Sequence, residues 1–287
     1  MTKKILFQFD GDALPSSFDA VVAIDSGVDH LIPYGGVQAT SIEPLVHGAM
    51  FTRGGDGLKN TAIFLGGSDV SAAETLLRCV TDTFFGPVRV SVMMDANGCN
   101  TTASAAVVAA SRHVDLRGAD AVVLGGTGPV GQRVARLLAG DGASVRLTSR
   151  SLSRAEKACM QVRDELQPRE ENAVGKVTAA ELATREDLSS ILSGANIVIG
   201  CGAAGVQFAT EDDLSRSNEL SVAIDLNAVP PAGLGGIDVT DKAKPLATGG
   251  AVGYGAIGVG GLKMKTHRRA IESLFESNDR VLNADEI

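Results

Sequence analysis

A glycine-rich loop near the middle of the chain constrains the fold more than any other segment. Its residues are Gly126, Thr127, Gly128, Pro129, Val130 and Gly131. The apolar run Asp120–Leu124 precedes the loop, an amphipathic segment follows it, and a second apolar run covers Ser144–Thr148. A strand, a tight glycine turn, a helix and a second strand in this order predict a βαβ unit with a parallel sheet.

Short apolar runs alternate with segments of helical period along the rest of the chain, which predicts an α/β fold. Further strands are expected at Ile5–Phe9, Val21–Ile24, Thr61–Leu65, Val88–Met94, Ile197–Cys201 and Val222–Leu226. Helices are expected at Val70–Phe85, Asn100–His113, Leu152–Leu166 and Thr266–Phe275. Residues 27–57 lack a clear period, and a glycine-dense loop is expected from Pro231 to the last helix.

The Ala- and Val-rich helix at Asn100–His113 marks the expected domain junction. We predict two domains in one subunit. Residues 1–102 with 265–287 form an α/β substrate domain, and residues 103–264 form a domain of the Rossmann type.

The composition argues against several classes of partner. The net charge is −8 and no long block of Lys or Arg occurs, so no basic field would attract nucleic acid. No run approaches the roughly 20 apolar residues that cross a bilayer. The apolar run Ile5–Phe7 is too short for the core of a signal peptide. The four cysteines and four histidines lack metal-binding spacing. We therefore expect a cytoplasmic protein without a metal.

The glycine loop predicts a dinucleotide site. Its glycines make the turn, admit the pyrophosphate and let the helix pack on the strand. The N-terminus of the following helix supplies free N–H groups and a positive dipole end to the phosphates. The alternative is a tight turn that binds no ligand.

The end of the second strand favours NADP over NAD. About 20 residues after such a loop, an NAD site carries an acidic residue for the ribose 2′-hydroxyl. This chain has Ser149, Arg150 and Ser151 there, so no carboxylate repels a 2′-phosphate and Arg150 can bind it. Arg154, one turn into the next helix, adds charge to the site or lies on a solvated face. We expect NADP as cofactor, with NAD accepted weakly.

The chain lacks the usual groups for proton transfer to a carbonyl. Neither tyrosine lies in a Ser-x-x-x-Tyr-x-x-x-Lys pattern, and no zinc-like Cys/His cluster occurs. These absences suit an oxidoreductase that moves a hydride alone.

Several segments then resemble a known family in order along nearly the whole chain. They are Lys3–Asp10, Phe18–Asp19, Thr52–Gly55, Phe84–Pro87, Asp95–Thr102, Gly126–Gly131, Asp225–Ala228, Gly235–Asp238 and Gly258–Lys263. The family is that of the NAD(P)-dependent methylene-tetrahydromethanopterin dehydrogenases. The glycine loop is generic, whereas Asp95–Thr102 and Gly258–Lys263 are much more specific.

The resemblance implies hydride transfer from 5,10-methylene-tetrahydromethanopterin to NADP, which gives the methenyl form, in one-carbon metabolism and formaldehyde oxidation. It also implies a pterin in the cleft between an NADP domain and the first domain. As partners we expect this small-molecule pterin and further copies of the chain in a homo-oligomer.

By the same resemblance, Lys263 matches a lysine beside the reacting carbon. The matches expected to bind substrate are Asp19, Asp95, Asn97, Asn100 and Thr102. Other interpretations remain open from the residues themselves. Lys263 can be a surface lysine ahead of the last helix, Asp19 a cap, and Asn97 part of a turn. Asn100 can cap its helix while Thr102 donates to a ligand.

Two other functions fit parts of the pattern. One is a methylene-tetrahydrofolate dehydrogenase; a cyclohydrolase activity is disfavoured because Gln38 and Gly258, not lysine, stand four residues after the two tyrosines. The other is a catalytically silent NADPH-binding sensor, which has no reason to keep the segments Asp95–Thr102 and Gly258–Lys263.

Overall fold

The computed structural model describes residues 2–166, 174–247 and 250–287. These residues form two compact units. Unit 1 comprises the chain up to Thr101 together with Met264–Ile287, and unit 2 comprises Thr102–Lys263. Both boundaries fall inside helices, namely α4 (Cys99–Ala110) and α9 (Ala256–Ser273). Which unit binds pterin and which binds NADP remains a prediction.

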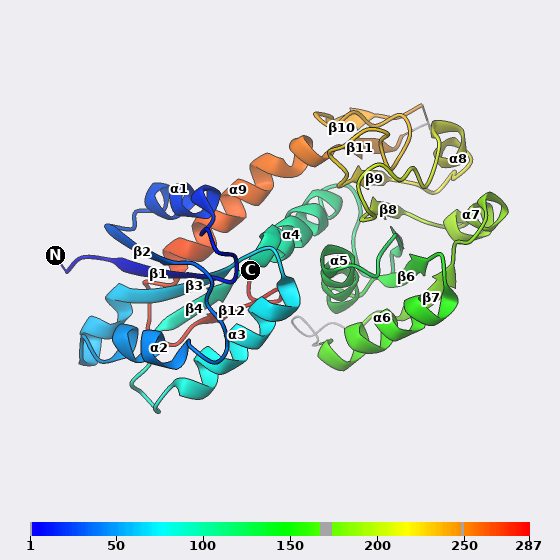
Figure 1. Ribbon diagram of the computed structural model, residues 1–287. Coiled ribbons are helices and arrows are strands. Elements are labelled where there is room, and N and C mark those ends of the chain that lie inside the picture. The colour runs from blue at the N-terminus through cyan, green and yellow to red at the C-terminus, as the bar shows by residue number, and fades with distance from the viewer. Residues whose placement is uncertain (1, 167–173, 248–249) are drawn as a thin grey trace. The chain divides into compact units, whose positions relative to one another are not determined.

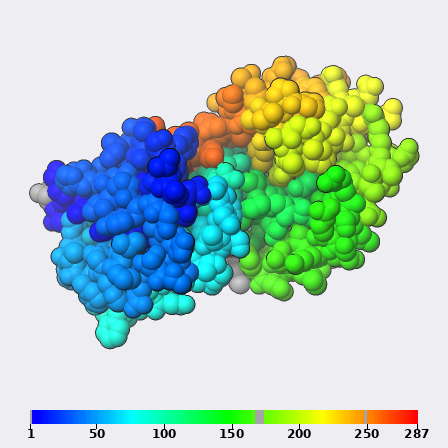
Figure 2. Space-filling view, in the orientation of Figure 1, coloured from blue at the N-terminus to red at the C-terminus, as the bar shows by residue number. Residues whose placement is uncertain are grey.

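Unit 1 contains a five-stranded sheet in the order β12-β4-β3-β1-β2, and all its neighbouring strands are parallel (Figure 1). The strands are β1 (Ile5–Asp10), β2 (His30–Tyr34), β3 (Thr61–Gly66), β4 (Ser91–Met94) and β12 (Val281–Leu282). The helices are α1 (Ser17–Asp25), α2 (Glu43–Met50), α3 (Val70–Thr83) and the 3-10 turns η1 (Gly55–Asn60) and η2 (Ala96–Gly98). Helices α1 and α9 pack on one face of this sheet. The blue N-terminal part of the chain forms much of the visible surface of unit 1 (Figure 2).

The strand predicted at Val21–Ile24 is wrong, because these residues belong to helix α1. The Ser16 side chain caps this helix by accepting a hydrogen bond from the Asp19 N–H at 3.2 Å. Val22 and Ala23 are buried in the core of unit 1, while Val21 and Ile24 are exposed. A capped helix with one buried face therefore overrides the strand preference of the β-branched residues.

Unit 2 contains a seven-stranded sheet in the order β10-β11-β9-β8-β5-β6-β7. The pair β10 and β11 is antiparallel and the other neighbours are parallel. The strands are β5 (Asp120–Leu124), β6 (Ser144–Ser149), β7 (Val177–Glu181), β8 (Ile197–Gly200), β9 (Val222–Asp225), β10 (Lys242–Pro245) and β11 (Val252–Tyr254). The helices are α5 (Pro129–Gly140), α6 (Leu152–Glu165), α7 (Arg185–Leu192) and α8 (Glu211–Ser215). Helices α4, α5 and α6 bury apolar side chains on one face, and α7 and α8 do so on the other.

The last helix begins ten residues earlier than predicted, at Ala256 instead of Thr266. Its glycine-rich first turns lie against the backbone of residues 238–242: a Cβ on Gly258 would lie 1.7 Å from the Asp241 carbonyl oxygen. The Val239 carbonyl also accepts the N–H of Ile257 at 2.8 Å. Glycine lowers helix propensity, but here it permits a backbone contact that no other residue allows.

The α/β class and the Rossmann-type parallel sheet are confirmed. The βαβ unit lies where the sequence predicts it, and the strand expected at Val88–Met94 is shortened to β4. Elements without a strong period were not predicted, notably β2, β7, α7 and the β10–β11 hairpin. In the described part of the chain, no helix combines the length and apolar character that a membrane crossing requires.

Candidate functional site

The glycine loop lies at the point in the sheet of unit 2 where the order of the strands reverses. From β5 the chain continues to β6 and β7 on one side, and then to β8 and β9 on the other. In open α/β sheets, ligands bind at the carboxyl ends of the strands at such a point. Gly125 has a φ of 66°, and a Cβ on it would lie 2.7 Å from the Gly202 Cα, so the loops after β5 and β8 touch.

The three glycines of the motif have different surroundings. A Cβ on Gly126 would lie 2.8 Å from the Leu147 side chain, so the turn needs a glycine there. A Cβ on Gly131 would lie 2.5 Å from the Gly126 Cα, so α5 can approach the loop only with a glycine at this position. No atom lies within 4 Å of a Cβ on Gly128. This position is therefore open, as the approach of a pyrophosphate to the backbone would require.

The start of α5 suits an anion. Gly128 is the N-cap residue and Pro129 follows at the first helical position, with no side chain capping the helix. The first N–H groups and the positive dipole end therefore remain available to a phosphate. The Gln132 side chain donates to the Thr127 carbonyl at 2.8 Å and holds the loop. Val130 packs against the core, so its side chain has a structural role.

The end of β6 forms one wall of a pocket of about 190 Å³. The predicted residues that line it are Thr127, Ser149, Arg150 and Arg154. Arg150 and Arg154 are exposed, and Arg150 makes no hydrogen bond or ion pair within the described residues. Ser151 is not part of this lining; its hydroxyl lies 2.9 Å from that of Ser153. The lining of this pocket thus includes both the glycine loop and the Arg150 guanidinium, a group that can bind an anion.

Sequence reasoning missed the apolar wall of this site. Leu182, Val206 and Phe208 line the pocket, and with Arg150 they also line an adjoining pocket of about 260 Å³. Apolar walls with a few polar groups suit a flat heteroaromatic ring. The segment Val177–Glu181 does not alternate regularly between apolar and polar residues, so the sequence contains no signal for the strand that precedes Leu182.

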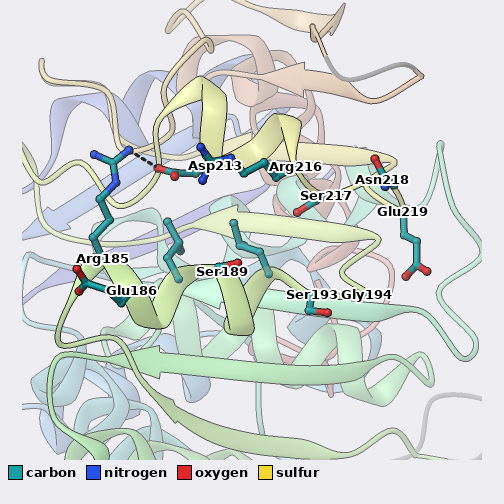
Figure 3. A pocket seen from close by; sticks show the side chains of 12 residues that line it. Arg185, Glu186, Ser189, Ser193, Gly194, Asp213, Arg216, Ser217, Asn218 and Glu219 are labelled. Atoms are coloured by element: carbon teal, nitrogen blue, oxygen red, sulfur yellow. Dashed lines mark hydrogen bonds and ion pairs between the residues drawn. The ribbon is translucent and has the colours of Figure 1, made fainter.

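A third pocket, of about 530 Å³, lies between α7 and α8 (Figure 3). Arg185 joins the two helices by donating to the Asp213 carboxylate at 3.0 Å, as the dashed line in Figure 3 marks. Among the described residues, none of the glycine loop lines this pocket. We therefore do not assign it to the cofactor.

Two groups near the loop after β8, the thiol of Cys201 and the carboxyl of Asp225, have raised pKa values. Burial raises the pKa of the Cys201 thiol well above its usual range, and the Asp225 carboxylate raises it further. Burial also raises the pKa of Asp225, although the N–H groups of Asn227 and Leu234 lower it. A protonated thiol is a poor nucleophile, so Cys201 gives no indication of covalent catalysis.

Asp95, and not Asn100, caps helix α4. The buried Asp95 carboxylate accepts the N–H groups of Asn100 and Thr101 at 2.9 and 3.0 Å, and the Thr101 hydroxyl at 2.6 Å. Asn100 is fully buried and donates to the Met94 carbonyl and to the Asn283 side chain. The expectation that Asn100 caps the helix is therefore wrong, because a carboxylate five residues earlier reaches the same N–H groups.

The other predicted substrate residues of unit 1 have different exposures. Asn97 is exposed, has a φ of 52° and donates its N–H to the Gly67 carbonyl at 2.8 Å, so it does form a turn. Asp19 is half-buried in the first turn of α1, where Ser16 is the cap. Thr102 is half-buried in α4, at the first residue of unit 2.

The turn at Asn97 lies at the carboxyl edge of the sheet of unit 1. The order of the strands in that sheet reverses between β1 and β3. The loops after these two strands touch, since a Cβ on Gly67 would lie 3.1 Å from the Gly11 nitrogen. Asp10, at the end of β1, accepts the N–H groups of Asp12 and Ser16 at 2.9 and 3.0 Å. This edge is the position that favours a ligand in unit 1.

Lys263 lies inside α9 and not ahead of it. Its side chain is partly exposed and makes no hydrogen bond or ion pair within the described residues. The amine is therefore available to a ligand, and the backbone that carries it is helical rather than a loop.

Comparisons with known proteins agree on one family. The family model described as methylene-tetrahydromethanopterin dehydrogenase, N-terminal, matches residues 17–97. A protein of Methylorubrum extorquens named bifunctional protein MdtA is 45% identical over 100% of this chain and 97% of its own length. The NAD(P)-dependent methylenetetrahydromethanopterin dehydrogenase of the same organism is 32% identical over 97% of this chain and 94% of its own.

A solved structure supports the fold. Quinate dehydrogenase from Corynebacterium glutamicum, determined in complex with NAD, superposes with a TM-score of 0.55 and 14% identity. The match covers 96% of this chain and 98% of that one. At this identity the likeness concerns the fold alone.

Proposed function

The chain belongs to the NAD(P)-dependent methylene-tetrahydromethanopterin dehydrogenase family, and on that premise we propose that it transfers a hydride from 5,10-methylene-tetrahydromethanopterin to NADP. The observation that carries this proposal is the pocket in which the glycine loop meets Arg150. Membership of a family of oxidoreductases and a pocket suited to a nucleotide phosphate both support hydride transfer to NADP.

We assign the binding of NADP to unit 2. The open space at Gly128 and the free first turn of α5 would hold the pyrophosphate. Arg150, with Ser149 and Arg154, would hold the 2′-phosphate through charge-assisted hydrogen bonds. The apolar side chains of Leu182 and Phe208 would pack against the adenine. When bound, the nicotinamide supplies the hydride acceptor.

We assign the binding of the pterin to the carboxyl edge of unit 1. The exposed Asn97 amide offers both a donor and an acceptor for the polar edge of such a ring. Loss of hydride leaves a cation delocalised over N–C–N, and no proton has to move. The work of this chain is therefore to hold the reacting carbons about 3 to 3.5 Å apart and to exclude water.

An assay that crosses two pterins with two nicotinamides tests this proposal. Purified protein is supplied with methylene-tetrahydromethanopterin or methylene-tetrahydrofolate, and with NADP or NAD, and reduction of the nicotinamide is followed by absorbance. We expect the highest kcat/KM with methylene-tetrahydromethanopterin and NADP. Turnover of the folate carrier alone would favour the folate dehydrogenase. NADPH binding without any turnover would favour the silent sensor.

We also propose that the protein is a cytoplasmic homo-oligomer. The four cysteines are free, which suits a reducing compartment. Sedimentation velocity at micromolar concentration tests the oligomeric state, and a mass equal to one chain would contradict it.

A further inference from the structure

A carboxylate from another strand lies next to the end of β6, although the residues Ser149, Arg150 and Ser151 at that end include no acidic residue. Glu181 is the last residue of β7 and pairs in register with Ser149 of β6. Its Oε1 atom accepts a hydrogen bond from the N–H of Leu152 at 3.2 Å. The next N–H along the chain, that of Leu182, donates to the Ser149 carbonyl at 2.8 Å, so the two strand ends are joined.

This contact puts a negative charge at the start of α6. Leu152 is the first residue of that 14-residue helix, and the side chain of its N-cap, Ser151, makes no capping hydrogen bond. Glu181 therefore takes the position in which a free N–H and the positive dipole end favour an anion. Arg150, two residues before Leu152, forms no ion pair with this carboxylate. Arg150 in the turn before α6 and Glu181 at the first N–H of α6 thus bring opposite charges to this end of the sheet.

We propose that Glu181 sets the balance between NADP and NAD, an inference that rests on the cofactor site proposed above. Because the Glu181 carboxylate is held at the N–H of Leu152, two residues after Arg150, a 2′-phosphate bound by Arg150 would lie close to it, and two negative charges repel each other. The 2′-hydroxyl of NAD can instead donate a hydrogen bond to the same carboxylate. Glu181 supplies from the neighbouring strand the acidic group that the loop after β6 lacks. Arg150 favours NADP, Glu181 opposes this preference, and both cofactors are accepted.

Binding of two small nucleotides separates the two effects. Adenosine 2′,5′-bisphosphate carries the 2′-phosphate, and adenosine 5′-monophosphate carries a 2′-hydroxyl in its place. Calorimetry gives the Kd of each for the wild-type protein and for Glu181→Gln. Glutamine keeps an oxygen acceptor for the Leu152 N–H and removes only the charge. We expect the bisphosphate to bind about three- to tenfold more tightly to the variant. Binding of the monophosphate should stay the same or weaken.

Glu219→Gln is the matched control. Glu219 is an exposed glutamate of the same unit that precedes β9, at the amino-terminal edge of the sheet and away from the pocket at Arg150. It should leave both Kd values unchanged.

Three outcomes overturn the inference. If Glu181→Gln changes both Kd values by the same factor, or changes neither, Glu181 does not discriminate between the cofactors although the site itself stands. If the wild-type protein binds neither nucleotide, the proposed cofactor site fails as well. Steady-state KM values for NADP and NAD with the same variants provide a second readout.

Discussion

Gly131 and Gly126 touch through their backbones, since a Cβ on Gly131 would lie 2.5 Å from the Gly126 Cα. Gly128, between them in the same loop, has no atom within 4 Å of its own Cβ position. One glycine therefore allows α5 to pack, whereas the other leaves room for a ligand. This difference makes the cofactor site separable from the fold by mutation.

Gly128→Val should fold and lose both cofactors. The residue has φ −80° and ψ 171°, an extended conformation that valine adopts readily, and the added side chain enters only the open space. Gly131→Val should instead lower the free energy of unfolding by about 1 to 3 kcal/mol or more, because the backbones must separate. Thermal unfolding and calorimetry with NADP measure the two effects. Tight NADP binding by folded Gly128→Val would refute the assignment of the loop.

Arg150→Ala should raise the KM for NADP strongly and leave that for NAD nearly unchanged. Loss of one charge-assisted contact costs about 1.5 to 3 kcal/mol of binding. Arg216→Ala removes an exposed arginine that lines the pocket of Figure 3 and should have no effect. An equal loss for both cofactors would contradict the assignment of Arg150 to the 2′-phosphate.

Asp95→Ala should destabilise the protein rather than weaken substrate binding alone. The variant leaves the buried N–H groups of Asn100 and Thr101 without the carboxylate, at a cost of about 2 to 4 kcal/mol. Denaturation in urea measures this loss, and Asp56→Ala is the control because Asp56 is fully exposed. Unchanged stability with a raised KM for the pterin would assign Asp95 to the substrate.

Lys263→Ala should cut kcat much more than it weakens NADP binding. The hydride step creates a cation and needs no base, so an ammonium beside it would be repelled and the role of Lys263 is positional. Lys263→Gln keeps a donor without charge and should retain part of the activity. Lys265→Ala, two residues along the same helix and exposed, is the control. Wild-type turnover by both Lys263 variants would leave Lys263 outside the site.

The local sequence pattern predicted helices and strands correctly where a segment has a strong hydrophobic period. The strand Asp120–Leu124 is identical to β5, and α5 and β6 follow it as expected. The βαβ unit needs only neighbouring residues: glycines for the turn, an apolar strand and an amphipathic helix. The helix at Val21–Ile24 was missed because β-branched residues favour a strand until the Ser16 cap and the burial of Val22 are known.

The class of fold and the position of the cofactor loop follow from residues close together in the sequence, because spacing alone determines which side chains share a face or a turn. Contacts between distant segments decided the rest. Glu181 reaches the Leu152 N–H across 29 residues, and the Val239 carbonyl accepts the Ile257 N–H where α9 begins. Such contacts depend on strand order and register, which no local pattern contains. The tertiary structure therefore decided which charge stands beside Arg150, and with it the proposed balance between the two cofactors.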